Sequence, residues 1–141
     1  SRLLLVDGSI PRVAGGRFAS GALLLAVTVL LVTPAALHLV SALQTLLLVP
    51  MASDRKGVSE TVQVMAYATA PCALAGPAIP ELRLACTAYG TVLLFLGLSR
   101  VHGLDSRRVA IAGGLPAAIV FGYGFRGLDP LALLLARWYI I

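Results

Sequence analysis

The amino-acid sequence predicts an all-α protein: a polytopic bundle of transmembrane helices with four main spans and a short C-terminal interfacial helix. Hydrophobic residues make up 59% of the chain and charged residues only 12%, with a mean hydropathy of +0.94, whereas soluble domains carry about a quarter charged residues. The apolar residues also lie in successive runs from Phe18 to Phe125, separated by short polar segments. Because a backbone in hydrocarbon must satisfy its own hydrogen bonds, each run is expected to be helical.

The chain divides into an N-terminal arm and one transmembrane domain. Residues 1–17 combine charged residues with glycines and prolines, which predicts an interfacial or extended arm. Residues 18–141 form the single transmembrane domain. The chain begins at Ser1 and its first residues lack the pattern of a signal peptide, so we expect that processing or incomplete coverage removed the true start.

The first apolar run, residues 18–50, would be roughly 50 Å long as a helix, more than the ~30 Å hydrocarbon layer. Either Pro34 kinks one long helix, or Thr33 and Pro34 begin the second arm of a hairpin. We favour the kinked helix, because a hairpin would place its turn in lipid and leave two arms of only about 16 residues.

Three further spans and a terminal helix follow, each bounded by charges, glycines or prolines. Their predicted ranges are 61–76, 84–99 and 109–125 for the spans, and 130–141 for the interfacial helix. Ser59 and Asp129 are the predicted N-caps of the second span and of the last helix. Pro116 is expected to bend or locally open the fourth span.

The polar segments 51–60 and 100–108 are predicted to lie on one side of the membrane. They hold five basic residues, against Arg83 and Arg126 on the other side, so the positive-inside rule makes them cytoplasmic. The arm complicates this count, since its three arginines would make it five to five. A hairpin at Pro34 or a missing earlier helix would remove the conflict, and both alternatives stay open.

Small residues recur at four-residue spacing in three of the predicted spans. Such patterns let helices approach closely in lipid, either within the bundle or at a docking face for a partner helix. The residues are Gly114, Ala118 and Gly122 in the fourth span, Cys86 and Gly90 in the third, and Ala66 and Ala70 in the second.

Polar chemistry inside the spans is sparse. His38 is the one ionisable residue there, which argues against a proton-coupled pump. With two histidines, two cysteines and no CxxC pair, we expect no cofactor and no metal. Cys72 and Cys86 should lie at similar depth, as a disulfide or as two buried thiols. No serine lies beside a base, so we do not expect an enzyme.

The distribution of charges bears on whether the protein binds nucleic acid, and the amide content bears on the kind of organism it comes from. The basic residues are scattered, which disfavours nucleic-acid binding. The chain has no Asn and a single lysine, Lys56. Scarce thermolabile amides fit a heat-living, thermophilic source, although lipid-facing sequences are also poor in Asn.

Two motifs resemble the Yip domain family, the Ypt-interacting proteins of Golgi traffic, in its prokaryotic or archaeal type. The first is Glu60-Thr61-Val62 leading into Ala66-Tyr67-Ala68-Thr69-Ala70-Pro71, and the second is Gly97-Leu98-Ser99-Arg100-Val101-His102-Gly103-Leu104. The motif residues are Tyr67, Pro71, Gly97, His102 and Gly103. The resemblance implies about five spans with both matched polar segments cytoplasmic.

Eukaryotic relatives bind prenylated small GTPases, but this chain lacks a clear first span and a long N-terminal region, so GTPase binding is not carried over. The motif residues also have structural explanations. Tyr67 could bind a carbonyl freed by Pro71. His102 suits the last turn of a helix, and Gly103 suits a left-handed cap.

We therefore expect a non-catalytic scaffold or accessory subunit in the cell membrane of a prokaryote, contacting lipids and other integral membrane subunits through its small-residue faces. Arg100, Arg107 and Arg108 would meet anionic head groups or an acidic partner. The alternative is a small transporter or lipid-handling protein that uses a polar stripe of His38, Ser41 and Thr45. A water-filled cavity reaching His38 would favour that alternative.

Overall fold

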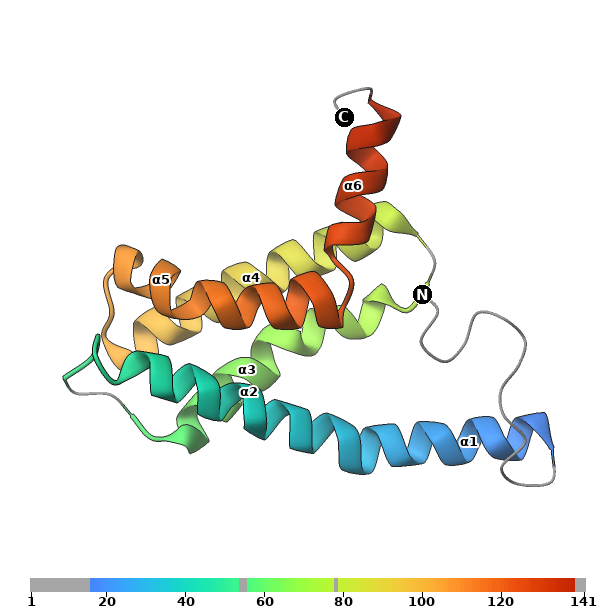
Figure 1. Ribbon diagram of the computed structural model, residues 1–141, viewed down its shortest axis with the longest axis horizontal. Helices are drawn as coiled ribbons and strands as arrows, with labels where there is room; N and C mark the ends of the chain where they lie inside the picture. The colour runs from blue at the N-terminus through green and yellow to red at the C-terminus, as the bar shows by residue number, and fades with distance from the viewer. Residues whose placement is uncertain (1–15, 54–55, 78, 139–141) are drawn as a thin grey trace. The chain divides into compact units, whose positions relative to one another are not determined.

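The computed structural model describes residues 16–53, 56–77 and 79–138, and the regular elements among them are all helical (Figure 1). The predicted N-terminal arm therefore lies outside the described residues except for its last two. In order, the elements are α1 (Arg17–Val27), η1 (Thr28–Val32), α2 (Thr33–Leu48), α3 (Val58–Thr69), η2 (Ala70–Ala75), α4 (Pro80–His102), α5 (Ser106–Ala117), η3 (Ala118–Gly124) and α6 (Leu128–Arg137). The chain divides into two compact units, of which the first ends at Leu37 and the second begins at His38.

The long N-terminal helix is continuous from Phe18 to Leu48 and long and apolar enough to span a membrane. The chain does not turn at Pro34, which excludes the hairpin. The helix has π-type hydrogen bonding over η1, just before the proline that cannot donate a backbone hydrogen bond. Thr33 Oγ1 adds a bond to the carbonyl oxygen of Thr28 at 2.9 Å. A kink at Pro34 remains a prediction.

The described residues contain two helices that could each cross a membrane, or three if one bent pair counts as a span. The second is α4, and the bent pair is α5–η3 with α6, which turns away by 72° (Figure 1). The predicted second span is divided into α3 and the 3-10 helix η2, where Pro71 follows Ala70. The count of four spans remains a prediction. It requires α3 and η2 together to form the fourth span.

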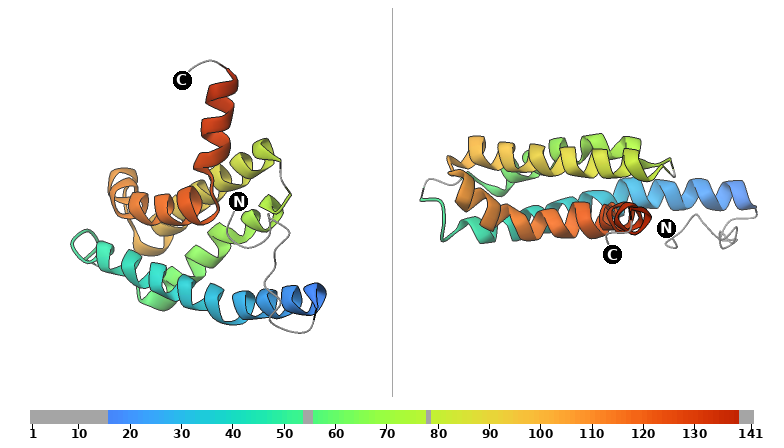
Figure 2. Two further views of the ribbon diagram at one scale, coloured as in Figure 1. Left: turned by 45° about the vertical axis from the view of Figure 1, so that its right-hand side comes forward. Right: turned by 90° about the horizontal axis from the view of Figure 1, so that it is seen from above.

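Helix α4 is the centre of the C-terminal unit and contacts α3, η2, α5, η3 and α6. The views of Figures 1 and 2 show α3, α4 and α5 running side by side. Glycines permit the close approach, because a Cβ on Gly90 would lie 2.7 Å from the Ala68 carbonyl oxygen and one on Gly97 would lie 2.6 Å from Val64 Cγ1. Around these contacts the core buries Met65, Leu94, Leu98, Val109 and Phe121.

Several helix ends differ from the prediction. Helix α3 begins at Val58 after Gly57, so Ser59 is not its cap. Helix α4 starts at Pro80, because proline suits the first turn, and is longer than the predicted third span. The Asp129 cap is also wrong, since the Asp129 carboxylate pairs with Arg126 at 2.5 Å and α6 begins after Gly127. Gly103 does end α4 in the left-handed region, with φ of 63°, as predicted.

Candidate functional site

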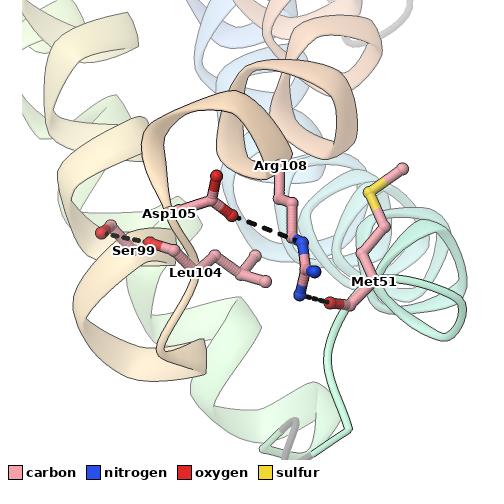
Figure 3. Close-up of polar contacts among 5 residues, drawn as sticks. All are labelled: Met51, Ser99, Leu104, Asp105 and Arg108. Carbon is pink, nitrogen blue, oxygen red and sulfur yellow. Dashed lines mark hydrogen bonds and ion pairs between the residues drawn. The ribbon is translucent and has the colours of Figure 1, made fainter.

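The two basic polar segments meet at one end of the C-terminal unit. Arg108 Nη1 donates to the Met51 carbonyl oxygen at 3.2 Å, and the Lys56 backbone N–H donates to His102 Nδ1 at 3.2 Å (Figure 3 shows the first contact). The two segments thus lie at the same end of the bundle, and their location on the cytoplasmic side of the membrane stays a prediction. These bonds connect the chain after α2 with the turn between α4 and α5.

The turn between α4 and α5 is held by its own side chains. Ser99 Oγ donates to the Leu104 carbonyl oxygen at 2.7 Å, across the left-handed Gly103 (Figure 3). Asp105 lies 3.4 Å from Arg108 Nε, one turn along the start of α5. The Asp105 carboxylate orients the Arg108 guanidinium toward Met51, so this cation has two partners.

A cavity of about 390 Å³ lies at this junction. It is lined by Met51, Ala52, Ser53, Lys56, Arg100, Val101, His102, Gly103, Leu104 and Arg108. Three of these residues are cationic, and no Asp or Glu is among the described residues that line it. Arg107, which the sequence analysis grouped with Arg100 and Arg108, is exposed and does not line the cavity.

His102 is buried beside the cavity and connects three helices. Its Nδ1 accepts from Lys56, so the ring proton lies on Nε2, which is 3.3 Å from Thr61 Oγ1. Thr61 Oγ1 in turn lies 3.1 Å from Thr45 Oγ1. The sequence analysis expected His102 to interact with the helix dipole and did not predict this network. The spacing of polar residues in α2 was the feature of the sequence that could have indicated it.

Gln44 has a role that the sequence analysis did not identify. Pro116 lacks a backbone N–H, so the Ala112 carbonyl four residues earlier loses its helical donor. Gln44 Nε2 donates to that carbonyl oxygen at 3.0 Å and so ties α2 to α5. The sequence feature that could have indicated this contact was a glutamine in an apolar run, together with a proline inside another span.

The polar stripe of the transporter alternative is divided by the structure. Ser41 is fully buried, Thr45 is half-buried, and His38 is exposed. Thr45 Oγ1 donates to the Ser41 carbonyl oxygen at 2.8 Å, while Ser41 Oγ and Gln44 Oε1 are buried without a partner among the described residues. None of these three residues lines the cavity at the junction of the polar segments or the apolar hollow between α4, η3 and α6.

The small residues occupy two kinds of environment. Cys86 and Gly90 are buried inside the bundle, where Gly90 faces Phe121 as well as Ala68. A Cβ on Gly114 would meet nothing within 4 Å. Ala66, Ala70 and Ala118 are exposed.

Ala118 and Gly122 line a second, apolar hollow of about 260 Å³ between α4, η3 and α6. The other lining residues are Leu84, Thr87, Ala88, Thr91, Ala117, Phe121, Gly127, Leu128 and Leu131. A Cβ on Gly122 would lie 3.4 Å from Leu128 Cδ1, an ordinary contact. Gly114 lies outside the lining of this hollow, and we call the helix face that carries Gly114, Ala118 and Gly122 the small-residue groove.

Tyr67, Pro71 and the cysteines have structural rather than chemical surroundings. The carbonyl that Pro71 frees belongs to Tyr67 itself and accepts from the Ala70 N–H, while the Tyr67 side chain is 75% exposed, so its predicted role is wrong. Cys72 and Cys86 are buried free thiols, with Cys72 Sγ 3.8 Å from the Cys86 carbonyl oxygen. In the described part of the chain, no three His, Cys, Asp or Glu residues could hold a metal ion.

Comparison with known proteins identifies the family. The family model of the Yip1 domain matches residues 3–126, which extends the resemblance beyond the two motifs to most of the chain. No match was found among curated proteins or among solved structures. The matched region includes the two candidate spans Phe18–Leu48 and Pro80–His102. The chain is therefore an integral membrane protein that belongs to the Yip1 domain family.

Proposed function

We propose that this protein is a non-catalytic scaffold or accessory subunit that docks against a transmembrane helix of another protein in the cell membrane of a prokaryote. The proposal agrees with the non-enzymatic character of the Yip1 family. The docking face is the small-residue groove, lined along one side of α5 and η3 by Gly114, Ala118 and Gly122.

The main support is that Gly114 has open space where a side chain would be. Lipid tails give helices no hydrophobic reason to associate, so close contact between backbones is the main source of affinity in a bilayer. Ile111 and Leu115, which flank Gly114, are 66% and 53% exposed and would add apolar contact. The groove therefore offers a second helix a close approach without rearrangement of the bundle.

The basic end of the bundle supports a membrane-surface position. Arg100, Arg107 and Arg108 are all exposed there. In the proposal they face the cytoplasm and contact anionic head groups or acidic residues of the partner, since basic residues are retained on that side. The groove would then give affinity, and the arginines would set depth and orientation.

The test is Gly114→Leu, with the protein solubilised gently from its native membrane. A leucine at this position fills the open space and should sharply reduce recovery of a stoichiometric partner. Ala42→Leu on α2 is the matched control, because Ala42 is an exposed small residue on another helix of the same unit. Unchanged partner recovery with Gly114→Leu, or equal loss with Ala42→Leu, would reject the groove as the docking face.

A further inference from the structure

The cavity at the junction of the polar segments is lined by three cations, two of which pair with no carboxylate among the described residues. Arg108 is occupied by Asp105 and by the Met51 carbonyl. Lys56 and Arg100 also line the cavity, and neither has a carboxylate partner within 4 Å among the residues described. Unpaired cations that converge on one hollow repel one another unless an anion joins them.

We infer that this cavity binds a phosphate group, held by Lys56, Arg100 and Arg108. Guanidinium and ammonium groups form their strongest hydrogen bonds with phosphate and carboxylate oxygens, and arginine does so with two parallel bonds. The three cations come from the chain after α2, the end of α4 and the start of α5. A bound phosphate would therefore bridge three segments.

The size and the walls of the cavity favour a phosphate ester over a peptide. At about 390 Å³ it lies near the lower end of small-molecule sites, which run from about 300 to 1,000 Å³. That space holds a phosphate with a glycerol or sugar attached, while an extended acidic peptide needs a long groove. The exposed Ser53 and the apolar Val101 and Leu104 complete the walls.

The position of the cavity makes a phospholipid head group one source of that phosphate. Candidate span α4 ends at His102, and the bent candidate pair begins at Ser106. The cavity residues lie at these ends, where spans leave hydrocarbon for the head-group layer. This step rests on the proposed function only in placing this end of the bundle at the membrane surface.

The test measures binding of dioleoyl phosphatidic acid, dioleoyl phosphatidylcholine and soluble glycerol 3-phosphate to the full chain in detergent micelles, by native mass spectrometry. We expect phosphatidic acid to be retained in preference to phosphatidylcholine. Lys56→Gln and Arg100→Gln should each weaken binding about tenfold, because each removes one charge-assisted bond. Arg107→Gln removes the same charge from the same polar segment but outside the cavity, so it loses only the screened surface attraction of the proposed head-group contact and should weaken binding by about twofold, clearly less than Arg100→Gln.

The three probes separate the sources of the phosphate. Glycerol 3-phosphate that displaces the lipid would support a soluble phosphate ester, and a lack of displacement would support the phospholipid head group. Equal weakening by Arg107→Gln, or equal retention of phosphatidylcholine, would overturn the inference in favour of a diffuse surface charge. Two crossed measurements distinguish failure of this site from failure of the proposed docking face. Partner recovery is measured with Arg100→Gln, which alters the cavity, and lipid binding is measured with Gly114→Leu, which alters the docking face.

Discussion

The glycines of α4 and of α5 show how one residue type serves two purposes in this bundle. Gly90 and Gly97 on α4 lie against Ala68 and Val64, so a Cβ at either position would overlap its neighbour. Gly114 on α5 faces open space, although it belongs to the same kind of four-residue pattern. A small residue thus permits close packing against a neighbouring helix in α4, and in α5 it leaves a surface to which another helix could pack.

The largest effect is expected from Gly90→Leu. The added side chain would meet the Ala68 carbonyl oxygen and the Phe121 ring, and overpacking of this kind costs about 3 kcal/mol. Labelling by a thiol-reactive dye on heating in micelles measures unfolding, because Cys72 and Cys86 are the only two cysteines and both are buried. A thermal midpoint within a degree of the wild type would show that α3, α4 and η3 are not packed as described.

Gln44→Leu should have the next largest effect, about 1–3 kcal/mol, because it leaves the Ala112 carbonyl without a donor. The matched test is a double-mutant cycle with Pro116→Ala, which restores a helical N–H for that carbonyl. We expect Gln44→Leu to cost less in the Pro116→Ala background. Equal costs in both backgrounds would mean that Gln44 does not serve the carbonyl freed by Pro116.

Thr61→Val should destabilise the bundle by about 1 kcal/mol, because it removes the hydroxyl between His102 and Thr45. Thr91→Val is the control, since Thr91 Oγ1 bonds only to the Thr87 carbonyl within its own helix. The same thermal labelling assay compares the two. If Thr91→Val lowered the midpoint as much as Thr61→Val, the connection through His102 would have no energetic weight.

The smallest effect on stability is expected from Gly114→Leu, within about 0.5 kcal/mol, because the new side chain enters open space. This variant sharpens the comparison with Gly90→Leu, since the substitution and the starting residue are the same. A large loss of thermal stability with Gly114→Leu would show that this surface is packed within the chain and would remove the basis of the proposed docking face.

Much of the local structure could be predicted from the sequence. The apolar composition identified membrane helices, Gly103 identified the end of α4, and two short motifs identified the family. The N-caps at Ser59 and Asp129 were wrong, because the helices begin two residues earlier than those caps imply and Asp129 pairs with Arg126 instead. Such ends depend on contacts that local propensity does not contain.

The candidate cavity could be predicted only in part. Arg100 and Arg108 were expected at a membrane surface, but Arg107 was grouped with them and Lys56 was not. The separation of Arg107 from its neighbours depends on the direction in which each side chain leaves the first turn of α5, and on the position of the chain after α2. Neither is a property of residue spacing alone.

By itself, the sequence determined that this protein is helical, enters a membrane and belongs to the Yip1 family, because hydropathy and short motifs are local properties. Only the tertiary structure decided that Gln44 serves the carbonyl freed by Pro116, that His102 joins three helices, and that Gly114 faces open space while Gly90 does not. The physical reason is that each of these outcomes depends on which helix face lies opposite a given residue. Residues far apart in the chain set that arrangement through packing and hydrogen bonds.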